Sequence, residues 1–210
     1  MTDPRERARE QFPSVLLGVL GIVQALVLEL LWERGIGGID RWREIGAGLA
    51  GWLQILSVFL GVVVVWLMYA TIVLRYSWVP RFADLVFPFV LGALQFLLVE
   101  QTAPERVAHF FVLLATIFVV SASMNFFIYQ AMSRGGDLPA RPRREQLRGY
   151  VPAAVASLAL LLCGALSGRA GAASPVTAAC LLAANLGLAL QIGVFRFYWK
   201  TDVTAPERRR

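Results

Sequence analysis

Charged residues are nearly absent from six long windows of this 210-residue sequence, and this feature constrains the fold more than any other. Drawn as a helix, each window is apolar on every face, whereas a helix on a soluble core needs only one apolar stripe. About 20 apolar residues in a helix span a membrane. The windows therefore predict membrane-spanning helices at residues 13–31, 45–74, 82–99, 107–132, 150–166 and 176–195.

The composition supports the same fold class for the whole chain. Only 16% of the residues are charged, whereas soluble domains carry about 25%. We expect a single all-α integral membrane domain over residues 1–210, a bundle of six transmembrane helices with short outer loops. The first window is longer than a signal-peptide core, and Trp32-Glu33-Arg34 follows it instead of small residues, so we expect a retained helix.

Basic residues are divided unequally between the two sets of loops. Fifteen of the twenty lie in the two tails and in the second and fourth loops, and five lie in the other loops. Since loops rich in Arg and Lys stay in the cytoplasm, both termini are predicted to be cytoplasmic. The 19 arginines and one lysine are typical of a GC-rich bacterial genome. The expected location is therefore the cytoplasmic (inner) membrane of a bacterium.

The fourth loop, residues 133–149, is predicted to be a basic cytoplasmic loop. Its arginines either determine orientation only or also attract anionic lipid headgroups, at about 1 kcal/mol per basic residue. The headgroup candidates are Arg141, Arg143, Arg144 and Arg148. No nucleic-acid partner is expected, because the basic residues are scattered over four segments. The expected partners are the bilayer with its anionic lipids, and either further copies of the chain or a larger membrane complex.

Small and polar residues recur at steps of three or four inside the windows. Small residues let membrane helices approach one another, so we expect these stripes to face the bundle. The stripes are Ser14, Gly18, Gly21, Ala25 and Glu29; Ala50, Gln54, Ser57 and Gly61; and Ala179, Ala183, Gly187 and Gln191. For the polar residues inside the windows, two interpretations remain open: they line a hydrated pathway, or they form hydrogen bonds between helices. These candidates are Gln24, Gln95, Ser121, Asn125, Asn185 and Gln191.

Two acidic residues suggest a cation site near the outer surface. Ionisable groups in lipid are costly and are therefore functional candidates. Glu29 lies within the first apolar window, and Glu100 ends the third at a similar predicted depth. With Gln54 of the second helix, they are predicted to form an outer acidic cation site. Ion pairing with Arg34 or Arg106 is the alternative.

The stretch between the third and fourth windows has the pattern of a helix start. Thr102 and Glu105 have the spacing of a capping box, and Pro104 falls in the first turn, where its missing N–H does no harm. The only cysteines, Cys163 and Cys180, are predicted to be small buried thiols, with a disulfide as the alternative. No residues have metal-ligand spacing, so neither a metal nor a cofactor is expected.

The sequence lacks the residues that most membrane enzymes need. His109 is its only histidine, and it contains no H-E-x-x-H, G-x-S-x-G, P-loop or dinucleotide motif. We therefore expect no enzyme and no catalytic residues. Two classes remain: a channel or carrier for a small cation with an outer acidic mouth, or a non-catalytic membrane subunit or sensor acting through its basic cytoplasmic surface.

Overall fold

The computed structural model describes residues 3–75, 82–135 and 143–198, and these contain helices and no strand. The long helices are α1 (Pro4–Leu30), α3 (Gly48–Arg75), α4 (Phe82–Glu100), α5 (Val107–Gly135), α6 (Arg143–Ala170) and α7 (Pro175–Tyr198). The short elements are the π-helix η1 (Leu31–Ile36), the helix α2 (Ile39–Glu44) and the 3₁₀-helix η2 (Pro104–Arg106). The predicted all-α class is confirmed for this part of the chain.

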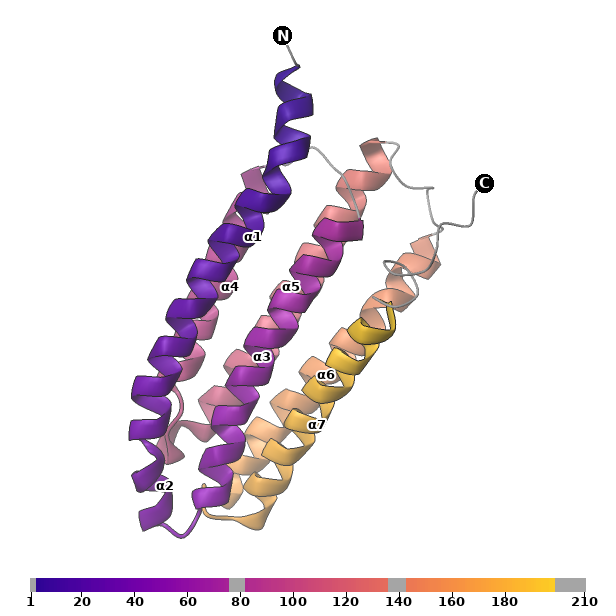
Figure 1. Ribbon diagram of the computed structural model, residues 1–210. Coiled ribbons are helices and arrows are strands. Elements are labelled where there is room, and N and C mark those ends of the chain that lie inside the picture. Colours follow the sequence, from indigo (N-terminus) through magenta and orange to yellow (C-terminus); the bar gives the residue numbers. More distant parts are fainter. Residues whose placement is uncertain (1–2, 76–81, 136–142, 199–210) are drawn as a thin grey trace.

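The long helices form two layers of three. Figure 1 shows α1, α3 and α7 in front of α4, α5 and α6. Neighbours pack within each layer, and α1 packs on α4 and α7 on α6 across the layers, whereas the two middle helices, α3 and α5, do not pack closely on each other. The start of α1 and the end of α7 share one end of the bundle, here called the terminal end. The other, which holds α2 and the α6–α7 turn, is the loop end.

Five helical segments among the described residues are long and apolar enough to cross a membrane. They are Glu10–Gly35, Gly48–Val73, Pro104–Gln130, Tyr150–Ala170 and Pro175–Phe197, and α4 contributes a shorter apolar run, Val86–Glu100. Large apolar side chains such as Leu158 and Leu190 are 70% and 72% exposed. Extensive apolar exposure of this kind indicates contact with a membrane or a partner. The chain therefore has the fold of a multi-pass membrane protein.

Glycines allow two close helix crossings. On α6, Gly164 faces α5 so closely that an added Cβ would lie 3.1 Å from the Cβ of Phe111 and 3.2 Å from the Ala108 carbonyl oxygen. On α4, a Cβ at Gly92 would collide with Cγ1 of Val23 on α1. Close backbone approach at small residues is how helices associate in lipid, where no hydrophobic force joins them.

The small-residue stripes do not all face the bundle. The stripe on α3, Ala50, Gln54, Ser57 and Gly61, is buried as predicted. On α1 the prediction was wrong, because the residues that pack inward are Leu16, Leu20, Gln24, Val27 and Leu31, while Gly18, Ala25 and Glu29 are exposed. On α7, Ala179, Ala183 and Gly187 are also exposed, but Ala183, Gly187 and Gln191 line a cavity between α5, α6 and α7. A bulky face of α1 can pack closely because its partner α4 supplies the glycine, Gly92.

Several helices extend beyond the predicted windows, and two boundaries differ in a way that changes the loops. Residues 39–44 form α2, and the chain turns at Gly46, where φ is +71°, before α3 begins at Gly48. Buried Trp42 of α2 packs against Gly51 of α3. The predicted loop 133–149 is helical at 133–135 and 143–149. Hydropathy marks only the apolar part of a helix, and residues such as Arg, Glu, Gln and Leu readily continue it in water.

Candidate functional site

A groove of about 680 Å³ lies at the loop end, between η1, α2, the end of α4 and η2. It contains three of the acidic residues that the sequence places on this side, and three arginines. The charged residues that line it are Glu33, Glu100, Glu105, Arg34, Arg41 and Arg106. Because guanidinium groups and carboxylates are equal in number, the lining has no excess of negative charge.

Both arginines that the sequence offers as partners contact Glu100, Arg34 at the carboxylate and Arg106 at the main-chain carbonyl oxygen. The Nε of Arg34 lies 4.0 Å from Oε1 of Glu100, and the guanidinium of Arg106 donates to the Glu100 carbonyl oxygen at 3.2 Å. The Arg34 and Glu100 side chains are 61% and 41% exposed. Exposed pairs of this kind contribute about 0–1 kcal/mol. The geometry is that of an ion pair at the rim of the bundle.

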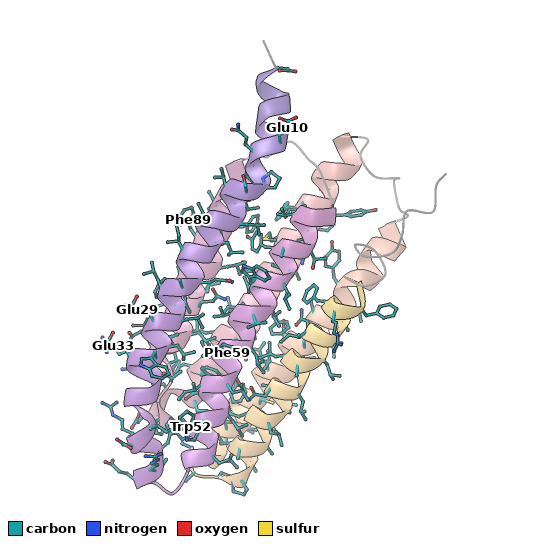
Figure 2. The ribbon with its side chains drawn as sticks, in the orientation of Figure 1. Glu10, Glu29, Glu33, Trp52, Phe59 and Phe89 are labelled. Carbon is teal, nitrogen blue, oxygen red and sulfur yellow. The ribbon has the colours of Figure 1, made fainter. Side chains whose placement is uncertain are left out.

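The other two members of the predicted cation site lie elsewhere. Gln54 is fully buried, and its Nε2 donates to the Gln101 carbonyl oxygen at 3.0 Å, which ties α3 to the end of α4. Glu29 is exposed on the outward side of α1 (Figure 2) and does not line the groove. Of the three residues, Glu100 lines the groove, Gln54 reaches the backbone of the neighbouring Gln101, and Glu29 lies outside the groove.

Thr102 does not form the predicted capping box. Its hydroxyl donates back to the Val99 carbonyl oxygen at 2.6 Å, and the helical turn starts at Pro104 with Ala103 as the N-cap, which has no side-chain cap hydrogen bond. Proline forces the residue before it into an extended conformation, and Ala103 has φ −144° and ψ 150°. The N-cap is therefore one residue later than predicted, and Thr102 closes α4 instead.

Replacing Thr102 by valine is expected to lower the free energy of unfolding by about 1 kcal/mol, because the volume is kept and one buried hydrogen bond is lost. Thermal unfolding of the purified protein in detergent measures the change. Glu105 is exposed, so Glu105→Ala should leave the unfolding temperature unchanged. A capping box would instead make the two substitutions similarly destabilising.

Two of the predicted polar candidates serve packing. The Nε2 of Gln24 donates to the Val62 carbonyl oxygen at 3.2 Å, which joins α1 to α3. The Nδ2 of Asn185 donates to the carbonyl oxygens of Leu53 and Leu181, each at 2.8 Å, which joins α7 to α3. With the Gln54 bond, these contacts tie α3 to α1, α4 and α7, and those of Gln54 and Asn185 lie toward the loop end.

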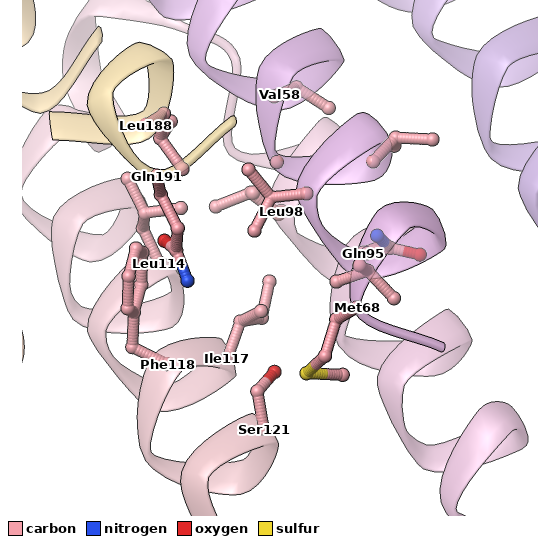
Figure 3. A pocket seen from close by; sticks show the side chains of 14 residues that line it. Val58, Met68, Gln95, Leu98, Leu114, Ile117, Phe118, Ser121, Leu188 and Gln191 are labelled. Atoms are coloured by element: carbon pink, nitrogen blue, oxygen red, sulfur yellow. The ribbon is translucent and has the colours of Figure 1, made fainter. Parts of the chain in front are cut away.

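Three others line a small cavity of about 30 Å³ between the two layers. Gln95 of α4, Ser121 of α5 and Gln191 of α7 contribute its polar side chains, and Figure 3 shows the two glutamines on opposite sides. Gln95 is only 2% exposed, and within the described residues neither its amide oxygen nor its amide nitrogen has a hydrogen-bond partner. Buried polar groups normally are hydrogen-bonded, so an orphaned amide beside a cavity requires an explanation.

A second cavity of about 850 Å³ adjoins the first and extends toward the terminal end. Ser121 and Gln191 belong to the walls of both cavities. Ser121, Asn125 and Tyr129 form a polar stripe on α5 that runs along the second cavity, and the Nδ2 of Asn125 lies 3.2 Å from the sulfur of Met68. The remaining walls, from α3, α6 and α7, are mainly apolar. We call these the small cavity and the wide cavity.

The chemistry of the two cavities is limited by their lining. No carboxylate, histidine, lysine or arginine of the described residues lines either cavity. Amide and hydroxyl groups can hydrogen-bond or coordinate a guest, but they do not perform acid–base chemistry at neutral pH. The sequence pattern indicated these polar residues and Gly187, whereas nothing in the sequence distinguishes a wall residue such as Ala156 from other alanines.

The remaining candidates fall outside these cavities or outside the described residues. Arg141 lies outside the described residues, as do the side chains of Arg143, Arg144 and Arg148, whose backbone begins α6. Cys163 and Cys180 are free thiols within hydrogen-bonding reach of each other. Within the described residues, no group of three or more His, Cys, Asp or Glu side chains could hold a metal ion.

Comparison with known proteins gives no family assignment. No family model, curated protein or solved structure matches this chain.

Proposed function

We propose that this protein is a carrier for a small monovalent cation, which it binds in the small cavity. The observation that carries the proposal is Gln95, a deeply buried amide without a partner that lines a cavity in the interior of a membrane-type bundle. A cation there would be coordinated by neutral oxygens from Gln95, Ser121 and Gln191. Transport would then need no catalytic step.

Neutral oxygens suit a monovalent cation. Selectivity filters replace the hydration shell of an ion with oxygen dipoles, and weak binding to such dipoles lets the ion leave again. A cavity of about 30 Å³ has room for roughly one or two waters or one dehydrated ion. The outer acidic site of the sequence-based hypothesis has a different chemistry, and the arginines beside Glu100 argue against it.

Access to the small cavity from one side favours a carrier over an open channel. Toward the terminal end it adjoins the wide cavity. Toward the loop end, Gln54 and Asn185 tie α3 to α4 and α7. A carrier exposes its central site to one side at a time. The arrangement corresponds to a state that is open toward the terminal end.

The proposal places six spans in the cytoplasmic membrane, with the terminal end in the cytoplasm. The sixth span is α4, whose apolar run is the shortest. The orientation rests on the fifteen-to-five distribution of basic residues.

A reporter enzyme fused after Arg210 that is active only outside the cytoplasm should remain silent, and one fused between Gly171 and Ala172 should be active. Enzyme activity in whole cells, normalised to the amount of fusion protein, provides the measurement. Activity after Arg210 would reverse the orientation and move the wide cavity to the outer side.

Cation flux into liposomes tests the function itself. The purified protein, reconstituted with an imposed sodium or potassium gradient, should give flux that saturates with cation concentration, as expected for a carrier with one binding position. Protein-free liposomes and liposomes with an unrelated membrane protein are the controls. Flux no greater than in these controls would refute the carrier proposal.

A non-catalytic subunit is the second candidate, and one observation favours it. The small-residue stripe of α1 faces outward, where another membrane helix could pack. The molar mass of the purified complex in detergent distinguishes an isolated chain from an assembly. Retention of a second, different protein through purification, together with absent flux, would favour this candidate.

A further inference from the structure

The wide cavity opens to the surroundings along the seam between α6 and α7. These helices pack on each other less extensively than α5 packs on α6 or α3 on α7. Near the loop end they meet at Cys163 and Cys180. Farther toward the terminal end, both contribute walls to the cavity, and wall residues such as Leu190 and Val194 are 72% and 52% exposed.

The residues along the seam, such as Ala159 and Leu190, are apolar and exposed, as expected of a surface that contacts lipid. Both helices lie in segments apolar enough to cross a membrane. The α5–α6 side of the cavity is closed at the same level, because the rings of Phe126 and Tyr150 stack edge to face with centroids 5.6 Å apart. A hydrocarbon chain in the bilayer can therefore reach the apolar walls of α6 and α7 without crossing water.

Basic residues occur at the terminal ends of the two helices that form the seam. Tyr129 and Tyr150 line this part of the cavity, and tyrosine is typical of the water–lipid boundary. Three arginines, Arg143, Arg144 and Arg148, precede Tyr150 in the first turns of α6, and exposed Arg196 lies in the last turn of α7. Basic residues near a membrane surface attract anionic lipids.

From these observations we infer that the wide cavity binds an anionic phospholipid, with one acyl chain against α6 and α7 and the phosphate near the basic ends of these helices. In this arrangement the acyl chain occupies only the α6 and α7 side of the cavity, so the side lined by Ser121 and Asn125 of α5 is left as the route of the cation to the small cavity. The site goes beyond the proposed cation carrier, since the lipid would be a bound component of the protein and not its cargo.

A pair of glycines on α7 tests the inference. Gly187 lines the wide cavity and Gly193 does not, and an added Cβ would meet nothing within 4 Å at either position. Both substitutions by leucine should therefore fold, since leucine is also the better helix former. Gly187→Leu should weaken phospholipid binding about tenfold, because the new side chain displaces roughly two methylene groups of the acyl chain. Gly193→Leu should bind like the wild type.

Binding is measured on the full chain in detergent by titrating phosphatidylglycerol and following bound lipid by native mass spectrometry and the unfolding temperature. Phosphatidylcholine with the same acyl chains should bind at least several-fold more weakly. Equal binding of the two lipids would overturn the anionic assignment, and unchanged binding by Gly187→Leu would overturn the site. Ala156→Phe, from the α6 wall, repeats the test if Gly187→Leu does not fold, with Ala165→Phe as its control outside the cavity.

Discussion

Replacing Gln95 by leucine is expected to make the protein more stable and at the same time to suppress cation flux. The amide of Gln95 is buried without partners, and leaving such a group unsatisfied costs about 1–3 kcal/mol. A leucine of similar size removes this cost. It also removes a coordinating oxygen from the small cavity, and a lost interaction of about 1.4 kcal/mol lowers a rate or an affinity tenfold. We expect at least about tenfold lower flux in liposomes and a higher unfolding temperature.

Gln24→Leu is the matched control, because the same substitution is made at a buried glutamine that serves packing. The amide of Gln24 donates to the Val62 carbonyl oxygen, so its loss should lower the unfolding temperature, and flux per folded protein should be retained. If Gln95→Leu leaves flux unchanged, the small cavity is not the cation site. If it lowers the unfolding temperature, the amide has a structural partner, contrary to its geometry.

Gly92→Ala is expected to destabilise the bundle by about 1–3 kcal/mol, the usual cost of overpacking a well-packed contact. The added methyl group would collide with Cγ1 of Val23 on α1. Valine has one strongly preferred rotamer in a helix, so Val23 cannot turn away without cost. The α1–α4 crossing must widen instead. The unfolding temperature of the purified protein in detergent reports the loss.

The control for Gly92 lies on the stripe that the sequence suggested as the contact face of α1. An added Cβ at Gly18 meets nothing within 4 Å, and alanine favours a helix by about 1 kcal/mol over glycine. Gly18→Ala should therefore be neutral or mildly stabilising. A larger loss at Gly18 than at Gly92 would mean that the small-residue stripe of α1 packs inside an assembly.

The positions of the helices could be predicted from the sequence because the hydrocarbon layer disfavours a charged residue at any position within it. A charged residue is costly wherever it lies in a span, so the six apolar windows mark the helices without knowledge of their partners. This rule does not predict where a helix ends, because helix ends lie outside the hydrocarbon layer. The helical residues 143–149 extend beyond the apolar window, and the helix start after Thr102 was misplaced by one residue because Pro104 made Ala103 the cap.

The small-residue stripe indicated the buried face of α3 correctly, but on α1 the buried face was decided only by the tertiary structure. Gly92 lets the bulky side of α1 approach α4, so the stripe that ends in Glu29 faces outward. Gln24, Gln95 and Asn185 are alike in sequence context, yet Gln24 and Asn185 bond to backbone carbonyls and Gln95 is left beside a cavity. The sequence determined where polar groups enter the membrane. Each polar group either joins two helices by a hydrogen bond or lines a cavity. Which of the two occurs depends on the position of carbonyl oxygens on a neighbouring helix, and only the packing of the bundle determines that position.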